Sequence, residues 1–227
     1  MQDNVSRAEI RYRTAEGESG EIMLGVVAKL EPKMSQVTPS PIRFPDHLLV
    51  SKNYFKPKWL KAHRRIKNVI SVGIGGSYLG PAFVSEVLAT EIQGIYSSQG
   101  FTLRFLSNVD PVDVERCVDG LDAEETLVVV VSKTFTTAET MLNARTMRQW
   151  LWDRMSSGEA CTEVTARHMV ACASDSSTDR VEKFGVQPAY FFKFWDWVGG
   201  RYSVCSSAGL VPLSLKYGFP LMEQLLD

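Results

Sequence analysis

The amino-acid sequence predicts an α/β domain over residues 67–227, in which a parallel β-sheet is flanked by helices, preceded by an irregular N-terminal arm over residues 1–66. Short β-branched segments alternate with segments of helical periodicity. Thr126–Val131 is apolar on both faces, as expected of a central parallel strand. With 44% hydrophobic residues among 227 and a net charge of −1, the chain also lacks the low hydrophobicity and high charge typical of disorder.

The first half of the predicted domain alternates strand and helix twice. Asn68–Ile74 (NVISVGI) is a short β-branched run that predicts a strand, and a glycine turn follows it. Leu79–Leu88 carries apolar residues at helical spacing and predicts a helix. Thr102–Ser107 is the second predicted strand, and Asp110-Pro111 opens a predicted helix over Val112–Val118.

The second half continues the alternation. Thr126–Val131 (TLVVVV) is the predicted central strand, and Ala138–Met155, with apolar residues at steps of three and four, predicts a long helix. His168–Ala173 and Tyr190–Phe194 are the fourth and fifth predicted strands, and Leu221–Leu226 is a final helix. Alternation of this kind favours a parallel sheet.

The N-terminal arm differs from the rest of the chain in charge. Residues 1–67 carry 13 basic and 7 acidic side chains, whereas residues 68–227 carry 12 and 19. Weak periodicity and many chain breakers predict irregular structure for the first 50 residues. Basic residues mixed with aromatic ones over residues 52–67 are compatible with a nucleic-acid surface, a solvated helix or a positive rim around an anion pocket. We expect no nucleic-acid partner.

The sequence offers no support for a metal, membrane or secreted function. The four cysteines have no C-x-x-C spacing and the three histidines form no H-x-x-x-H pair, so reduced thiols and structural histidines are expected. No apolar run approaches the ~20 residues of a membrane helix, and no secretory signal is visible. The expectation is a cytoplasmic protein with no membrane partner and no bound metal.

A glycine-rich turn, Gly73-Ile74-Gly75-Gly76-Ser77, lies between the first predicted strand and helix. Glycine lets the backbone approach a ligand closely, and a helix N-terminus offers free N–H groups to an anion. The turn is not a dinucleotide fingerprint, because Tyr78 stands where G-x-G-x-x-G requires glycine. A tight turn without a ligand is the alternative interpretation.

A second loop, Ser132-Lys133-Thr134-Phe135-Thr136-Thr137, follows the TLVVVV strand and opens the long helix. Four hydroxyls and one cation exceed the single residue that a helix cap requires. Together with the N–H groups of the helix start, they predict a pocket for a dianionic phosphate. The Walker motif is missing, which disfavours triphosphate hydrolysis. Because ligands of parallel sheets bind beyond the carboxyl ends of the strands, the two loops predict a sugar-phosphate pocket.

A third segment, Phe194–Ser203 (FWDWVGGRYS), places two glycines directly before Arg201. The glycines can let the backbone bring Arg201 into a cleft, where its permanent charge would stabilise a developing oxyanion. The alternative is a structural turn with Arg201 paired to Asp196. The residues alone leave both interpretations open.

Together these segments resemble the phosphoglucose isomerase (glucose-6-phosphate isomerase) family. The resemblance covers about Asn68 to Leu226 and rests on motifs in the family's order and spacing. These are VGIGGSYLGP (Val72–Pro81), SNVDP (Ser107–Pro111), SKTFTTAET (Ser132–Thr140) and FWDWVGGRYSV (Phe194–Val204). It implies a sugar isomerase (SIS) domain with a flavodoxin-like three-layer αβα arrangement. Tyr78 replaces the smaller or acidic residue of many members, a change that we expect to be tolerated.

The resemblance implies aldose–ketose isomerisation of glucose 6-phosphate and fructose 6-phosphate, a cofactor-free step of glycolysis and gluconeogenesis. Carried over by position, the residues take three roles. The phosphate-binding residues are Ser132, Lys133, Thr134 and Thr137, the residues lining the sugar are Gly76 and Ser77, and Arg201 faces the enediolate.

In the family, the glutamate base, a ring-opening histidine and a lysine near the ring oxygen lie beyond the equivalent of Asp227. The expectation is therefore a fragment: a SIS domain truncated at its C-terminus, inactive alone, from a protein that is a homodimer when complete. A phosphosugar-binding module without catalysis is the alternative, and nucleic-acid binding through residues 52–67 is a third hypothesis.

Overall fold

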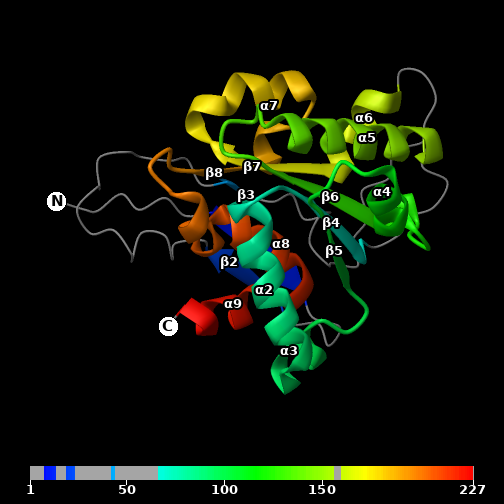
Figure 1. Ribbon diagram of the computed structural model, residues 1–227. Helices are drawn as coiled ribbons and strands as arrows, with labels where there is room; N and C mark the ends of the chain where they lie inside the picture. Colours follow the sequence, from blue (N-terminus) through cyan, green and yellow to red (C-terminus); the bar gives the residue numbers. More distant parts are fainter. Residues whose placement is uncertain (1–7, 14–18, 24–41, 44–65, 156–159, 227) are drawn as a thin grey trace.

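The computed structural model describes residues 8–13, 19–23, 42–43, 66–155 and 160–226. Its centre is a five-stranded sheet in the order β5-β4-β6-β7-β8, in which all neighbours are parallel (Figure 1). The strands are β4 (Asn68–Val72), β5 (Thr102–Leu106), β6 (Thr126–Val131), β7 (Met169–Ser174) and β8 (Phe191–Phe194). The parallel sheet predicted from strand–helix alternation is thus confirmed.

Helices cover both faces of this sheet, so the predicted three-layer α/β fold is confirmed (Figure 1). On one side lie α2 (Gly76–Thr90), α3 (Ile92–Ser97), α8 (Ser207–Tyr217) and α9 (Phe219–Leu226). On the other lie α4 (Pro111–Val118), α5 (Ala138–Met155), α6 (Ala160–His168) and α7 (Thr178–Phe184). Within the described ranges, no helix has both the length and the apolar character needed to cross a membrane.

The core is built around the three inner strands β4, β6 and β7, and all six residues of β7 are buried. All six residues of β6 and all five of β4 are buried, because helices cover the sheet on both faces. Burial of each such valine or leucine side chain contributes about 1.5–3 kcal/mol. Helix α8 is also buried along most of its length, from Ser207 to Ser214. Its apolar residues therefore form no single stripe, and the sequence pattern did not predict this helix.

The N-terminal arm contains three strands that the sequence analysis did not predict. β1 (Ala8–Arg13) pairs antiparallel with β2 (Ser19–Met23) and parallel with β3 (Ile42–Arg43). The rest of residues 1–65, including most of the basic segment 52–67, lies outside the described residues. The boundary between arm and domain at residues 66 and 67 stays a prediction.

Candidate functional site

Three segments singled out in the sequence follow strands of the same sheet. The glycine turn follows β4, the hydroxyl-rich loop follows β6, and the segment with the Trp, Gly and Arg residues follows β8. After β4 the chain adds β5 on one side and then crosses to add β6 on the other. The switch in winding direction therefore lies between β4 and β6. In open α/β sheets this is where ligands bind, beyond the carboxyl ends of the strands.

The glycine turn brings the start of α2 against a distant part of the chain. Gly75 precedes the helix with φ +58°, a conformation that favours glycine. A Cβ at Gly76 would lie 2.0 Å from the carbonyl oxygen of Gly200, so the two backbones are in direct contact. The Tyr78 ring packs edge-on against Phe105, with centroids 5.8 Å apart. Tyr78, at the position where the resemblance leads us to expect a smaller or acidic residue, thus has a packing partner.

A buried serine, Ser203, donates hydrogen bonds to both of the backbone segments that meet at Gly76 and Gly200. Ser203 lies in the 3₁₀ helix η4 (Gly200–Cys205), and its Oγ is 2.7 Å from the Gly200 carbonyl and 3.1 Å from the Gly76 carbonyl. One hydroxyl therefore bridges the two segments. Ser203 was not among the predicted site residues, although it lies in the FWDWVGGRYSV motif.

The hydroxyl-rich loop has an internal hydrogen-bond pattern and one unusual backbone residue. Ser132 Oγ donates to Thr137 Oγ1 at 3.3 Å, and the hydroxyls of Thr134 and Thr136 lie 2.7 Å apart. Phe135 has φ 51°, a left-handed conformation that costs on the order of 1–3 kcal/mol in a residue other than glycine. Its ring is buried and packs edge-on against Phe184. The buried ring anchors a strained turn that leaves the threonines near the surface.

The backbone of the same loop presents donors without protein acceptors. Among the described residues, no acceptor is found for the N–H groups of Lys133, Thr134, Thr136 and Thr137. They lie in the loop that leads into α5, whose helix dipole adds positive potential there. Thr134 and Thr136 are exposed and Thr137 is half-buried. Four N–H groups and three threonine hydroxyls in one short loop are suited to the oxygens of a phosphate.

Lys133 contacts the segment that follows β8. Its Nζ donates to the carbonyls of Asp196 and Val198 at 3.1 and 3.2 Å. The hydroxyl-rich loop and the glycine–arginine segment are thus joined directly. The predicted role of Lys133 in phosphate binding stays a prediction, and its free backbone N–H is the group that remains available for it.

Arg201 follows the contact between Gly76 and Gly200, and its side chain is exposed. In the described part of the chain it forms no ion pair. Asp196, the alternative partner, instead accepts a hydrogen bond from Ser176 Oγ at 2.9 Å. The Arg201–Asp196 pair of the structural interpretation is therefore not formed, and the proposed role toward an enediolate stays a prediction.

Nothing in the described ranges forms a cluster of three or more metal-binding side chains. His168 is buried and its Nδ1 lies 2.8 Å from the Thr126 carbonyl, a contact inside the fold. Burial raises the pKa of the Cys117 thiol to about 11 and also raises that of Cys172. Burial likewise raises the pKa of Tyr190 to about 12. None of these four groups belongs to the candidate site.

Known proteins match this chain closely over its second part. The family model of phosphoglucose isomerase matches residues 51–227. The match therefore begins within the predicted arm, which covers residues 1–66. Glucose-6-phosphate isomerase, cytosolic A, of Oryza sativa subsp. japonica is 52% identical over 178 residues, covering 78% of this chain and 30% of the relative. The cytosolic glucose-6-phosphate isomerase of Arabidopsis thaliana is 55% identical over 161 residues, covering 71% and 28%.

A solved structure shows the same relationship in three dimensions. The glucose-6-phosphate isomerase of Chlamydia trachomatis D/UW-3/Cx superposes with a TM-score of 0.59 at 32% identity, covering 71% of this chain and 28% of that one. The chain thus spans less than a third of the length of these relatives. With the family model matching most of its residues and the motif loops lying at one sheet edge, the chain belongs to the phosphoglucose isomerase family.

Proposed function

We propose that this chain supplies the phosphosugar-binding sheet of an enzyme that interconverts glucose 6-phosphate and fructose 6-phosphate in glycolysis and gluconeogenesis. The observation that carries the proposal is the set of free N–H groups and hydroxyls at the start of α5. The names of the rice and Arabidopsis relatives support the substrate and a cytoplasmic location.

In this proposal the substrate lies across the carboxyl ends of β4 and β6. Its phosphate binds the side chains of Ser132, Thr134 and Thr137 and the free N–H groups of the loop. Its sugar lies toward Gly76 and Ser77. During isomerisation a base moves a proton between two adjacent carbons through a cis-enediolate. The Arg201 guanidinium stabilises the negative charge that develops on the enediolate oxygen.

The proposal assigns binding and charge stabilisation to this chain, and proton transfer to parts of the longer family proteins that it does not match. Asp196 and Glu139 are acids that lie close to the glycine–arginine segment and to the hydroxyl-rich loop in the sequence. Asp196 is engaged with Ser176, and Glu139 is an exposed residue in the first turn of α5. We therefore propose a partial enzyme, which forms a homodimer in its complete form. The alternative is a module that binds phosphosugars without converting them.

The first experiment measures turnover by purified residues 1–227. We expect negligible isomerisation, because loss of general-base catalysis alone lowers a rate by about 10² to 10⁴. A coupled assay of fructose 6-phosphate formation gives the measurement. The Arg201→Ala variant, prepared in parallel, is the control, since a contaminating isomerase would be equally active in both preparations. Turnover in the wild-type chain that Arg201→Ala abolishes would overturn the partial-enzyme proposal.

The second experiment measures binding of glucose 6-phosphate by calorimetry. Thr137→Val should weaken binding by about 1–3 kcal/mol, because it removes a hydroxyl from the phosphate site and leaves a partner unpaired. Thr146→Val is the matched control: it lies within α5, away from the loop that ends at Thr137, and its hydroxyl donates to the Leu142 carbonyl at 3.1 Å. Equal affinity of the wild type and Thr137→Val would place the phosphate elsewhere.

A further inference from the structure

The backbone of Lys133 is fixed to the end of β7. Its carbonyl accepts hydrogen bonds from Ser174 N at 2.9 Å, Ser174 Oγ at 2.8 Å and Ser177 Oγ at 3.0 Å. Both serines are fully buried. A carbonyl held by buried donors on a neighbouring strand end has little freedom, so the position of Lys133 is set by β7 as well as by its own loop.

The side chain of Lys133 reaches in another direction, to the turn after β8. Its ammonium donates to two carbonyls of that turn, Asp196 at 3.1 Å and Val198 at 3.2 Å. Hydrogen bonds from a charged donor are stronger than those between neutral groups. Val198 is separated from Gly200 by one residue, and Gly200 contacts Gly76. One side chain therefore links the hydroxyl-rich loop to the segment that carries Arg201.

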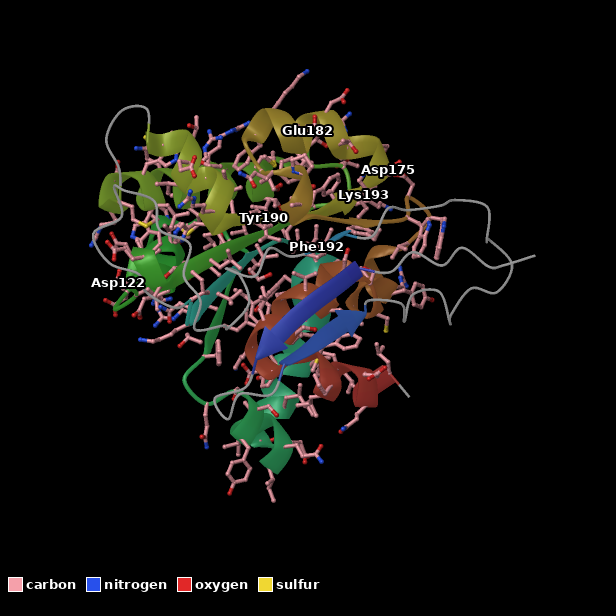
Figure 2. All side chains as sticks on the ribbon, turned by 180° about the vertical axis from the view of Figure 1, so that it is seen from behind. Asp122, Asp175, Glu182, Tyr190, Phe192 and Lys193 are labelled. Carbon is pink, nitrogen blue, oxygen red and sulfur yellow. The ribbon has the colours of Figure 1, made fainter. Side chains whose placement is uncertain are left out.

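Two other side-chain contacts join the ends of β7 and β8, one to Asp196 at the beginning of this turn and one to Lys193 within β8. Ser176 Oγ donates to Asp196 Oδ1 at 2.9 Å. Lys193 and Asp175 form an exposed ion pair at 2.6 Å, and Figure 2 shows them side by side at the same end of the sheet. Among these three contacts, the Lys133 ammonium alone contacts Val198, next to the two glycines.

We propose that Lys133 is a positioning residue, whose ammonium clamps the Asp196–Val198 turn so that the Gly199-Gly200-Arg201 segment is held beside the phosphate loop. The phosphate is bound by the N–H groups and hydroxyls of the loop, and the ammonium of Lys133 is not one of its ligands. The inference rests on the proposed function, and it refines the role that sequence resemblance assigns to Lys133.

The test combines amide hydrogen exchange with ligand binding in the full 227-residue chain. Two amides report on the clamped segment, because Val198 N donates to the Trp195 carbonyl and Tyr202 N donates to the Gly199 carbonyl. In Lys133→Met, exchange at both amides should accelerate about tenfold or more as the segment opens locally. The affinity for glucose 6-phosphate should stay within about threefold of wild type, a change of under 1 kcal/mol.

Lys193→Met is the matched control, because it removes a lysine that is ion-paired on the neighbouring strand end and makes no contact with the Val198 carbonyl. Lys193→Met should leave the hydrogen-exchange rates of both amides unchanged. Unchanged exchange in Lys133→Met overturns the proposal, whatever its affinity. Affinity that falls about tenfold or more, with exchange unchanged, would instead identify the ammonium as a phosphate ligand.

A measurement on the wild-type chain covers the case in which Lys133→Met does not fold. With lysine side chains labelled with ¹⁵N, the Lys133 ammonium should show slowed proton exchange, because both its acceptors are protein carbonyls. Proton exchange at the Lys133 ammonium as fast as that of fully exposed lysines would overturn the clamp. If the wild-type chain binds no glucose 6-phosphate, the proposed function fails, whereas both exchange measurements still decide the role of Lys133.

Discussion

Arg201 has an exposed guanidinium directly after Gly200, whose backbone leaves no room for a side chain at Gly76. We expect Arg201→Ala to lower kcat by about 10²-fold or more if the guanidinium stabilises an enediolate. KM should change less, because the phosphate is bound by the loop after β6. The measurement uses a complete enzyme in which residues 51–227 replace the matching segment of the rice relative.

The control for this substitution is thermal stability. Arg201 is exposed and forms no ion pair with the residues that the structure describes, so Arg201→Ala should unfold at the wild-type temperature. Arg201→Lys keeps the charge but not the planar donor geometry, and it should retain only part of the activity. Lower stability with an unchanged kcat would show that Arg201 is structural.

Helix α2 and the 3₁₀ helix η4 depend on a contact that only glycine permits. Gly76→Ala would place a Cβ 2.0 Å from the Gly200 carbonyl oxygen, so the two elements must move apart. We expect a loss of about 1–3 kcal/mol, typical of overpacking. For a chain of this size each kcal/mol corresponds to roughly 2–4 °C in Tm, which calorimetry resolves.

Gly199→Ala is the matched control for this pair of elements. Gly199 has φ −71°, which any residue adopts, and a Cβ there would meet the Tyr202 ring at an ordinary 3.4 Å. It should cost far less stability than Gly76→Ala. Equal effects of the two alanines would mean that the Gly76–Gly200 contact does not control how α2 sits against η4.

The whole domain should lose stability at alkaline pH through its buried thiols. Burial raises the pKa of Cys117 from 9.0 to about 11, so the unfolded chain releases the proton first. The resulting stability is fully present below pH 9 and is lost as the pH rises toward 11. Linkage predicts a loss of about 2 kcal/mol by about pH 10.5 from this group. Urea unfolding at about pH 8.5 and 10.5 measures the loss.

Cys117→Ala separates this effect from other alkaline titrations. Without the thiol, the decrease in unfolding free energy between the two pH values should be smaller by about 2 kcal/mol. Cys172 is also buried and its pKa is raised as well, so Cys172→Ala should act in the same direction. An identical decrease in wild type and Cys117→Ala would show that this thiol does not couple folding to pH.

Elements whose pattern is local could be predicted from the sequence. The limits of β6 and α5 match the predicted ones, because a doubly buried strand and a helix with regular apolar spacing are both visible in neighbouring residues. Helix α8 was missed because burial along most of its length removes the stripe that marks a helix. The short helices α3, α6 and α7 were missed as well. The strand β1 and its partners were missed because they lie in a stretch rich in chain breakers, which predicts irregular structure.

By itself, the sequence determined the fold class, the family and the loops that end β4, β6 and β8, because each depends on residues that are consecutive in the chain. Only the tertiary structure decided how the loops meet. Gly76 contacts Gly200, and the Lys133 ammonium binds carbonyls 63 and 65 residues away. These contacts follow from strand order, with β4 beside β6 and β7 between β6 and β8. No local pattern contains that order, because it arises from packing between distant segments.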